Sequence, residues 1–89
     1  MKNSFKEFIE DYELPEEGLI DDSTYEYSCV DSDELNGYAS KFFDDDSFEV
    51  SESDADIDTL IITYTNGEFE ITFSSNFAED AYNITAGVR

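Results

Sequence analysis

The sequence predicts a small α+β domain, in which an antiparallel sheet of three to four strands is flanked by two to three short helices. Three observations predict this fold class. Apolar residues repeat at helical spacing in residues 4–12 and 32–43, they alternate along residues 59–65 and 68–74, and an Asn-Gly pair separates the last two segments. The expected element order is α-β-α-β-β-β-α, within a single domain that spans residues 1–89.

The N-terminal half supplies two helices and one strand. The apolar residues of segment 4–12 form one helical stripe, Phe5, Phe8, Ile9 and Tyr12. Residues 24–30 alternate between Tyr or Cys and polar residues, which predicts a half-buried strand. Residues 32–43 predict a second helix capped by Ser32, although Gly37 in its interior is unfavourable. The apolar stripe of this second helix is Leu35, Tyr38, Ala39 and Phe42.

The C-terminal half predicts a β-hairpin. Its strands are Thr59–Thr65 and Glu68–Ser74, and Asn66-Gly67 predicts a two-residue type I′ turn between them. The alternation turns Glu68 and Glu70 outward. The residues expected to face the core are Phe69, Ile71 and Phe73 on one strand and Leu60, Ile62 and Tyr64 on the other.

Two further segments complete the expected order. Residues 48–53 predict a strand before the hairpin, with a partly ordered loop over residues 44–58 as the alternative. The tail predicts a short helix capped by Ser75 or Asn76. The apolar residues of this tail helix are Phe77, Ala81, Tyr82 and Ile84.

The net charge of the chain is its most unusual property. It has 24 acids, four bases and no histidine, for a formal net charge of −20, whereas a small domain typically carries a magnitude of about 2–8. Self-repulsion of this size destabilises a compact state. Adaptation to high salt and solubility are the alternatives, but the chain favours Phe, Ile, Tyr, Asn and Ser over the Ala, Val and Gly of salt-adapted proteins, and solubility needs far less charge. We therefore expect the function to use the charge.

The residue types argue against an enzyme. Without histidine there is no histidine general base, and a single cysteine, Cys29, forms neither a thiolate zinc site nor an intramolecular disulfide. Asp54, Asp56 and Asp58 have the spacing that opens an EF-hand loop, but the later glycine and glutamate positions of that loop are both threonine. We expect no catalytic residue, no metal site and no cofactor.

The chain is expected to be cytoplasmic. Its N-terminus lacks the apolar region of a signal peptide, and its longest apolar run is Leu60-Ile61-Ile62. An anionic membrane surface would repel it, so no membrane partner is expected.

A basic protein is the expected partner. Direct binding of nucleic acid is excluded, because phosphates are bound by Lys and Arg. Acids at positions i and i+2 of a strand lie about 6.5–7 Å apart on one face, which resembles the spacing of successive phosphates along a DNA strand. Phe43 and Phe48 are candidate apolar anchors, with a place in the core as the alternative. The expected partner-binding residues are Asp44, Asp45, Asp46, Glu49, Glu52, Asp54, Asp56, Asp58, Glu68 and Glu70.

In length, negative charge, scarcity of bases, abundance of aromatics and α+β pattern, the whole chain resembles the small acidic DNA-mimic inhibitors. These include phage anti-CRISPR proteins, antirestriction proteins and uracil-DNA glycosylase inhibitors. The segment Asp11-Tyr12-Glu13-Leu14-Pro15 also resembles a stretch of ArdA-type antirestriction proteins. The resemblance implies a phage or mobile-element protein, monomeric or a small homo-oligomer, in the host bacterial cytoplasm. It would block the basic DNA- or RNA-binding groove of a CRISPR effector, a restriction enzyme or another nuclease.

Two alternatives share the same composition. Immunity proteins that neutralise basic nuclease toxins are small and acidic, and so are regulators or chaperones of basic nucleoid proteins. The sequence leaves both open.

Overall fold

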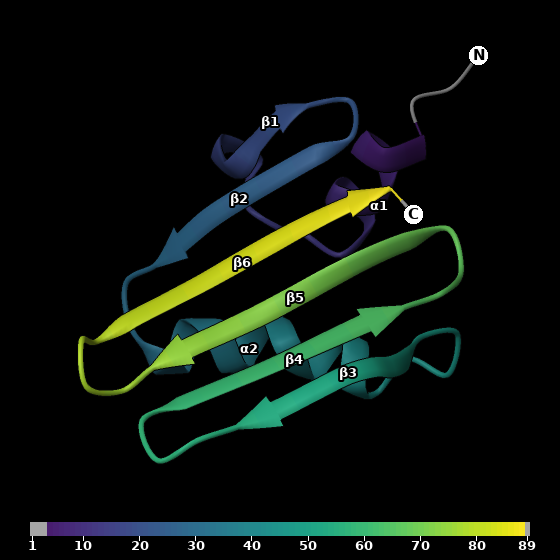
Figure 1. Cartoon of the computed structure of the whole chain (residues 1–89). Helices are drawn as coiled ribbons and strands as arrows, with labels where there is room; N and C mark the ends of the chain where they lie inside the picture. The colour runs from purple at the N-terminus through teal and green to yellow at the C-terminus, as the bar shows by residue number, and fades with distance from the viewer. Residues whose placement is uncertain (1–3, 89) are drawn as a thin grey trace.

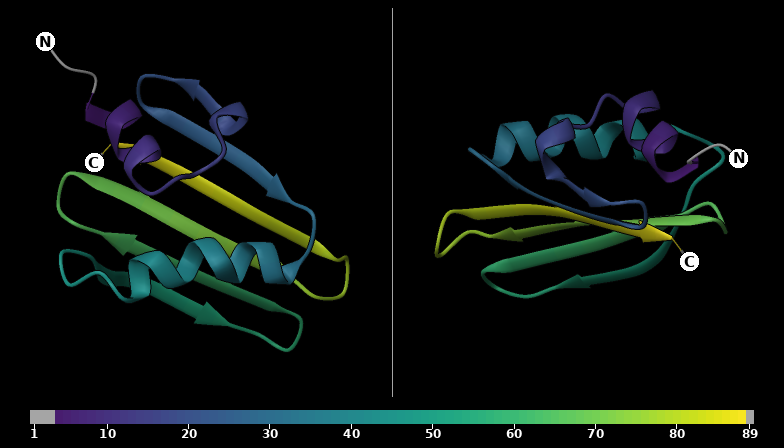
Figure 2. Two further views of the ribbon diagram at one scale, coloured as in Figure 1. Left: turned by 180° about the vertical axis from the view of Figure 1, so that it is seen from behind. Right: turned by 90° about the horizontal axis from the view of Figure 1, so that it is seen from above.

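The computed structural model describes residues 4–88, which form a six-stranded antiparallel sheet with two α-helices on one face (Figures 1 and 2). The strand order is β1-β2-β6-β5-β4-β3. The helices are α1 (Ser4–Asp11), α2 (Ser32–Phe43) and a 3-10 turn, η1 (Glu16–Gly18). The strands are β1 (Leu19–Asp21), β2 (Thr24–Cys29), β3 (Glu49–Ala55), β4 (Thr59–Thr65), β5 (Phe69–Asn76) and β6 (Ala81–Val88).

The expected fold, three to four strands in the order α-β-α-β-β-β-α, is wrong. The fold is mainly β, with six strands in one sheet. The sequence pattern missed two of these strands, β1 and β6. With only three residues, β1 is too short to show an alternation. The predicted helices over 4–12 and 32–43 and the strands over 24–30, 48–53 and 59–65 correspond to α1, α2, β2, β3 and β4.

The expected C-terminal helix is strand β6, which lies between β2 and β5 near the middle of the sheet (Figure 1). The cap signal at Asn76 belongs to a short turn instead, since Asn76 Oδ1 accepts hydrogen bonds from the amides of Ala78 and Glu79 at 3.2 Å each. Beyond the turn, Tyr82 and Ile84 alternate into the core and are buried. Pairing on both edges and burial on one face outweigh the local helical pattern.

The hairpin turn also differs from the predicted type I′ turn at Asn66-Gly67. The last pair in the β4–β5 ladder is Thr65 with Glu70, and the Asn66 amide donates to the carbonyl of Phe69 at 3.3 Å. The turn is therefore centred on Gly67 and Glu68. Gly67 has φ of +92° and Glu68 does not have a positive φ, whereas a type I′ turn requires it at both central residues. A two-residue turn at Asn66-Gly67 would pair Thr65 with Glu68 instead of Glu70. Because the strand pairing differs by two residues, the side chains predicted to face the core still face it.

The core lies between the sheet and the helices. Phe5, Phe8 and Ile9 of α1 are buried, as the stripe predicted, whereas Tyr12 remains half-buried. The Phe8 ring stacks on Phe69 of β5, with centroids 4.8 Å apart. The buried residues that the sheet contributes include Tyr25, Cys29, Tyr64, Phe69, Ile71, Phe73, Tyr82 and Ile84.

The second helix anchors the other half of the core. Leu35 and Phe42 of α2 are buried, and the rings of Phe42 and Phe48 meet edge to face at 5.1 Å. Its N-cap is Asp31 and not Ser32, because Asp31 Oδ1 accepts a hydrogen bond from the Glu34 amide at 2.9 Å. Both helices cover the same side, so the opposite side of the sheet, called here the open face, carries no helix of residues 4–88 (Figure 2).

Candidate partner-binding site

The open face is a polar surface of cross-strand rows. One row runs through Glu52, Thr63, Thr72, Thr85 and Glu26, on five neighbouring strands. Within it, the hydroxyl oxygens of Thr63 and Thr72 are hydrogen-bonded at 2.8 Å. Thr63 and Thr65 of this face are buried, and the Thr65 hydroxyl donates to the carbonyl of Phe69 at 2.8 Å, so their hydroxyl groups have hydrogen-bond partners.

Strand β3 forms one long edge of the sheet, and all seven of its residues are exposed. The chain segments before and after it bring further acids to the same edge. We call this set of eight acids the acidic edge: Asp44, Asp45, Asp46, Glu49, Glu52, Asp54, Asp56 and Asp58. It gathers eight of the ten predicted partner-binding residues.

A β-bulge aligns three acids of this edge on the open face. The β3–β4 register shifts between Val50 and Glu52, so that Glu49, Glu52 and Asp54 lie opposite residues 65, 63 and 61 of β4. Those three β4 positions alternate along the strand and share one face, with successive positions about 6.5–7 Å apart. Without the extra residue, Glu49 would point to the opposite face from Glu52. The bulge therefore brings all three acids to the same face of the sheet, in line along the strand.

Asp45 differs from its neighbours because it is engaged within the fold. Its carboxylate accepts hydrogen bonds from the Tyr12 hydroxyl and, through Oδ1, from the Ser47 amide at 2.9 Å and the Ser47 hydroxyl at 2.6 Å. The hydrogen bonds from Ser47 and Tyr12 lower the pKa of Asp45. Burial, followed by the contact with Asp45, raises the pKa of Tyr12 to about 12. Asp44 and Asp46, in contrast, are exposed.

The other end of the acidic edge is the β3–β4 turn. Asp56 Oδ1 accepts a hydrogen bond from the Ile57 amide at 2.7 Å, and the carbonyl of Asp58 accepts one from the Phe77 amide at 2.8 Å. These contacts fix the turn against the β5–β6 loop. Among the described residues, no group of three or more acid or cysteine side chains is placed to hold a metal ion.

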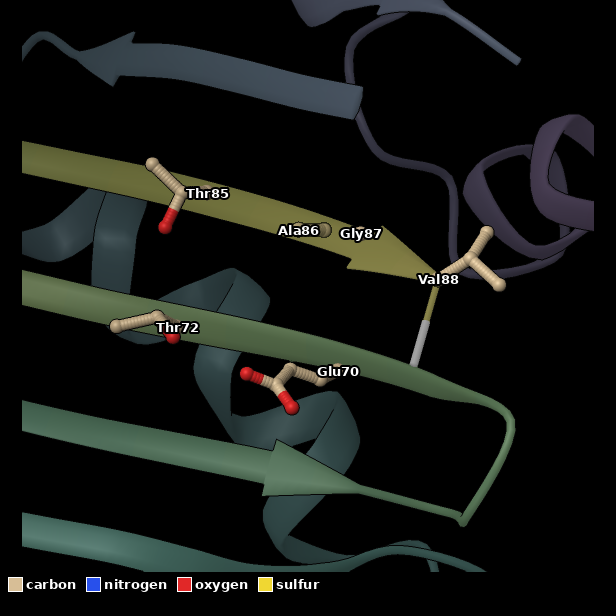
Figure 3. Close-up of a pocket in the computed structure, with 6 residues that line it drawn as sticks. All are labelled: Glu70, Thr72, Thr85, Ala86, Gly87 and Val88. Atoms are coloured by element: carbon tan, nitrogen blue, oxygen red, sulfur yellow. The ribbon is translucent and has the colours of Figure 1, made fainter. Parts of the chain in front are cut away.

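The remaining two predicted residues lie apart from this edge. Glu68 is in the β4–β5 turn, where its amide is bonded to the Asn66 side chain. Glu70 is on the open face of β5, separated from the acidic edge by β4, and lines a shallow pocket with Thr72, Thr85 and Val88 (Figure 3). Glu70 is therefore not part of the line formed by Glu49, Glu52 and Asp54 on β3.

The positive charges of the described chain lie on the helical side. Lys6 belongs to α1 and Lys41 to α2, and both helices cover the side opposite the open face (Figure 2). Lys41 Nζ donates to the Tyr12 carbonyl at 2.8 Å and lies 3.9 Å from Glu13 Oε1. These contacts hold the Lys41 ammonium on the helical side.

The two candidate apolar anchors have different positions. Phe43 is 76% exposed at the end of α2, next to Asp44, whereas Phe48 is buried in the core. Sequence reasoning missed several other exposed apolar residues, among them Ile57 and Phe77. The signal for Ile57 was its place between two aspartates, a poor position for a core residue.

The chain has no match among the known proteins with which it was compared. No protein-family model, no curated protein and no solved structure matches the chain. Within residues 4–88, neither α-helix is long and apolar enough to cross a membrane.

Proposed function

We propose that the protein is a DNA mimic, which inhibits a nucleic-acid-binding defence complex of a bacterial host by occupying its basic groove. The observation that carries the proposal is the bulge in β3. It aligns Glu49, Glu52 and Asp54 at a spacing similar to that of phosphates on one DNA strand. A bulge of this kind re-aims side chains, and here it re-aims a carboxylate into a line of carboxylates.

The length and charge of the edge support a groove as the binding site. Seven residues of β3 span about 23 Å at 3.3 Å per residue. Exposed acids continue the edge at both ends, through Asp44 and Asp46 on one side and Asp56 and Asp58 on the other. Each carboxylate can accept paired hydrogen bonds from an arginine that otherwise binds a phosphate.

The charge imbalance supports rapid association with a basic target. A net charge of −20 attracts a cationic groove over distances beyond contact, and it repels competing acidic surfaces. A CRISPR effector, a restriction enzyme or another nuclease has such a groove. The proposed site of action is the cytoplasm of the host, where these enzymes meet DNA.

Competition with DNA tests the proposal. The tagged protein is incubated with host lysate, with and without excess duplex DNA, and captured nucleases are identified and titrated. Mimicry predicts that DNA displaces the captured enzyme. A nuclease that remains bound in the presence of its DNA would contradict mimicry and point to an immunity protein.

A pair of variants with equal charge locates the site. Glu49→Gln/Glu52→Gln/Asp54→Asn removes the aligned carboxylates, and Glu10→Gln/Glu16→Gln/Glu17→Gln removes three exposed acids from the helical side. We expect the first variant to bind the captured enzyme at least tenfold more weakly, a loss of about 1.4 kcal/mol or more. The second variant should lose much less. Equal losses would show that only total charge matters.

A further inference from the structure

Three loops meet at one end of the sheet, and they form a surface that shares only Asp56 and Asp58 with the acidic edge. They connect β2 to α2, β3 to β4 and β5 to β6 (Figures 1 and 2). The ladders bring their bases together, because Cys29 pairs with Tyr82 and Asn76 pairs with both Ala81 and Thr59. We call this surface the loop end and define it as residues 30–33, 56–58 and 77–80.

Each loop exposes one large apolar side chain. Ile57 is 90% exposed, Val30 is 82% exposed and Phe77 is 52% exposed. A single exposed apolar residue is ordinary, but one on each of three adjoining loops forms a set that favours an interaction surface.

The loop end is held in place by hydrogen bonds of its backbone and by one ring contact. The Phe77 amide donates to the Asp58 carbonyl at 2.8 Å, which ties the β5–β6 loop to the β3–β4 turn. The Phe77 ring also meets the Tyr82 ring edge to face at 6.1 Å, and the Ile57 amide is bonded to the Asp56 carboxylate. Loops whose backbone is already ordered lose less conformational freedom when they bind.

The charge of the loop end selects among possible occupants. Besides the three apolar residues, the loop end contains six acids: Asp31, Asp33, Asp56, Asp58, Glu79 and Asp80. The two lysines of the described chain lie toward the opposite end, in α1 and in the last turn of α2. A second copy of this chain would bring like charges together, which is unfavourable. A cationic surface with an apolar pocket is complementary.

We propose that the loop end inserts Ile57 and Phe77 into an apolar pocket that is rimmed by Lys and Arg on the target protein. The inference rests on the proposed function and adds a second point of contact to it. The acidic edge attracts the target and aligns with its groove. The apolar anchors slow dissociation, because apolar side chains that become buried in the contact exclude water from it.

A defined probe tests this without the target. The probe is a 14-residue amphipathic helical peptide of leucine and lysine, and its comparison is an oligolysine of equal charge. Ile57→Ser/Phe77→Ser removes the anchors and keeps every acid. Ile20→Ser/Val88→Ser is the matched control, since these residues are also exposed, at 60% and 50%, and lie outside both the loop end and the acidic edge.

We expect the anchor variant to bind the leucine–lysine peptide at least tenfold more weakly than the parent chain, while its affinity for oligolysine is unchanged. The matched control should bind both peptides as the parent does. Amide resonances of residues 30–33, 56–58 and 77–80 should shift on titration with the leucine–lysine peptide. The amide spectrum of each variant without peptide checks its fold, and Ile57→Ser alone should reproduce part of the loss.

Three outcomes would overturn the inference. One is equal binding of the leucine–lysine peptide by the anchor variant and the parent, and another is amide shifts confined to residues 44–54 of the acidic edge. The third is a dimer of the parent in sedimentation that the anchor variant loses, which would assign the loop end to a second copy. If the inference fails while duplex DNA still displaces the captured nuclease, the proposed function stands with the acidic edge as its contact surface.

Discussion

At the scale of single residues, Asp45 shows that one acid in a charged run can have a structural role. Asp44, Asp45 and Asp46 are indistinguishable in the sequence, yet Asp45 alone joins Tyr12 of the segment after α1 to the turn at Ser47. That contact links residues 33 positions apart. A three-residue reversal to lysine would therefore combine loss of partner binding with loss of this contact, and Asp44 and Asp46 are the better probes of binding.

The lowered pKa of Asp45 predicts a pH-dependent effect of Asp45→Asn. A carboxyl group whose pKa is lower in the folded state stabilises the fold above its unfolded pKa, about 4, and loses that contribution as pH falls through the folded value. The parent should therefore exceed Asp45→Asn in free energy of unfolding at pH 6, and the difference should shrink towards pH 3. Urea unfolding at both values measures it.

The control for this prediction is Asp46→Asn, which removes the same charge from an exposed neighbour. Comparison of the two variants separates the contact of Asp45 from general charge repulsion. A difference between the parent and Asp45→Asn that stays constant from pH 6 to pH 3 would contradict the assignment.

At the scale of elements, the sequence predicts those whose pattern is local. The stripe of Phe5, Phe8 and Ile9 gave α1, and the alternation of Tyr25 to Cys29 gave β2. The acidic edge was also visible as a run of acids, whereas its alignment was not. That alignment depends on a bulge that only pairing with β4 defines.

The missed strand β6 depends in part on a distant partner. The tail segment from Phe77 to Tyr82 has a helical pattern on its own, but β6 pairs with β5, which directly precedes it, and with β2, which lies far from it in the sequence. The turn residue that the pattern placed second, Gly67, is first in the observed turn. No local signal distinguishes the predicted β4–β5 pairing from the observed one, because a shift of two residues in the pairing keeps every side chain on its face.

Helix α2 allows a test of the one unfavourable residue in its interior. Gly37 is exposed, and an added Cβ would meet nothing within 4 Å. Gly37→Ala should therefore raise the free energy of unfolding by about 0.5–1 kcal/mol, because glycine loses more backbone entropy than alanine when a helix forms. Chemical denaturation of both chains measures the gain.

The opposite result is expected at Gly18, which serves as the control. An added Cβ there would lie 2.6 Å from Cζ of Tyr25 and 2.8 Å from Cβ of Tyr27. Gly18→Ala should lower stability by about 1–3 kcal/mol, as overpacked substitutions do. A loss of stability at Gly37 would show that α2 is not the regular, unobstructed helix described above.

At the scale of the whole molecule, repulsion between the acidic side chains opposes folding. A formal charge of −20 is carried on a body of 44 × 25 × 19 Å, so each acid has others within its electrostatic range. The aromatic core between the helices and the sheet offsets that repulsion, with Phe8 in ring contact with Phe42, Phe48 and Phe69. Neither the acidic edge nor the loop end has a basic side chain of its own, which is the arrangement expected of a surface that another protein completes.

This opposition predicts that salt acts in contrary directions on folding and on binding. The Debye length falls from about 30 Å at 0.01 M salt to about 10 Å at 0.1 M, so added NaCl screens repulsion within the fold. The midpoint of thermal unfolding should rise between these concentrations, by about 4–8 °C for each kcal/mol of repulsion removed. Glu49→Gln/Glu52→Gln/Asp54→Asn should start from a higher midpoint at 0.01 M and gain less from salt.

Over the same range of salt concentration, the affinity for a basic partner should fall, since screening weakens attraction between the two proteins. Calorimetry and binding titrations on one salt series measure both slopes, and two slopes of equal sign would contradict a fold whose charge is kept for its partner.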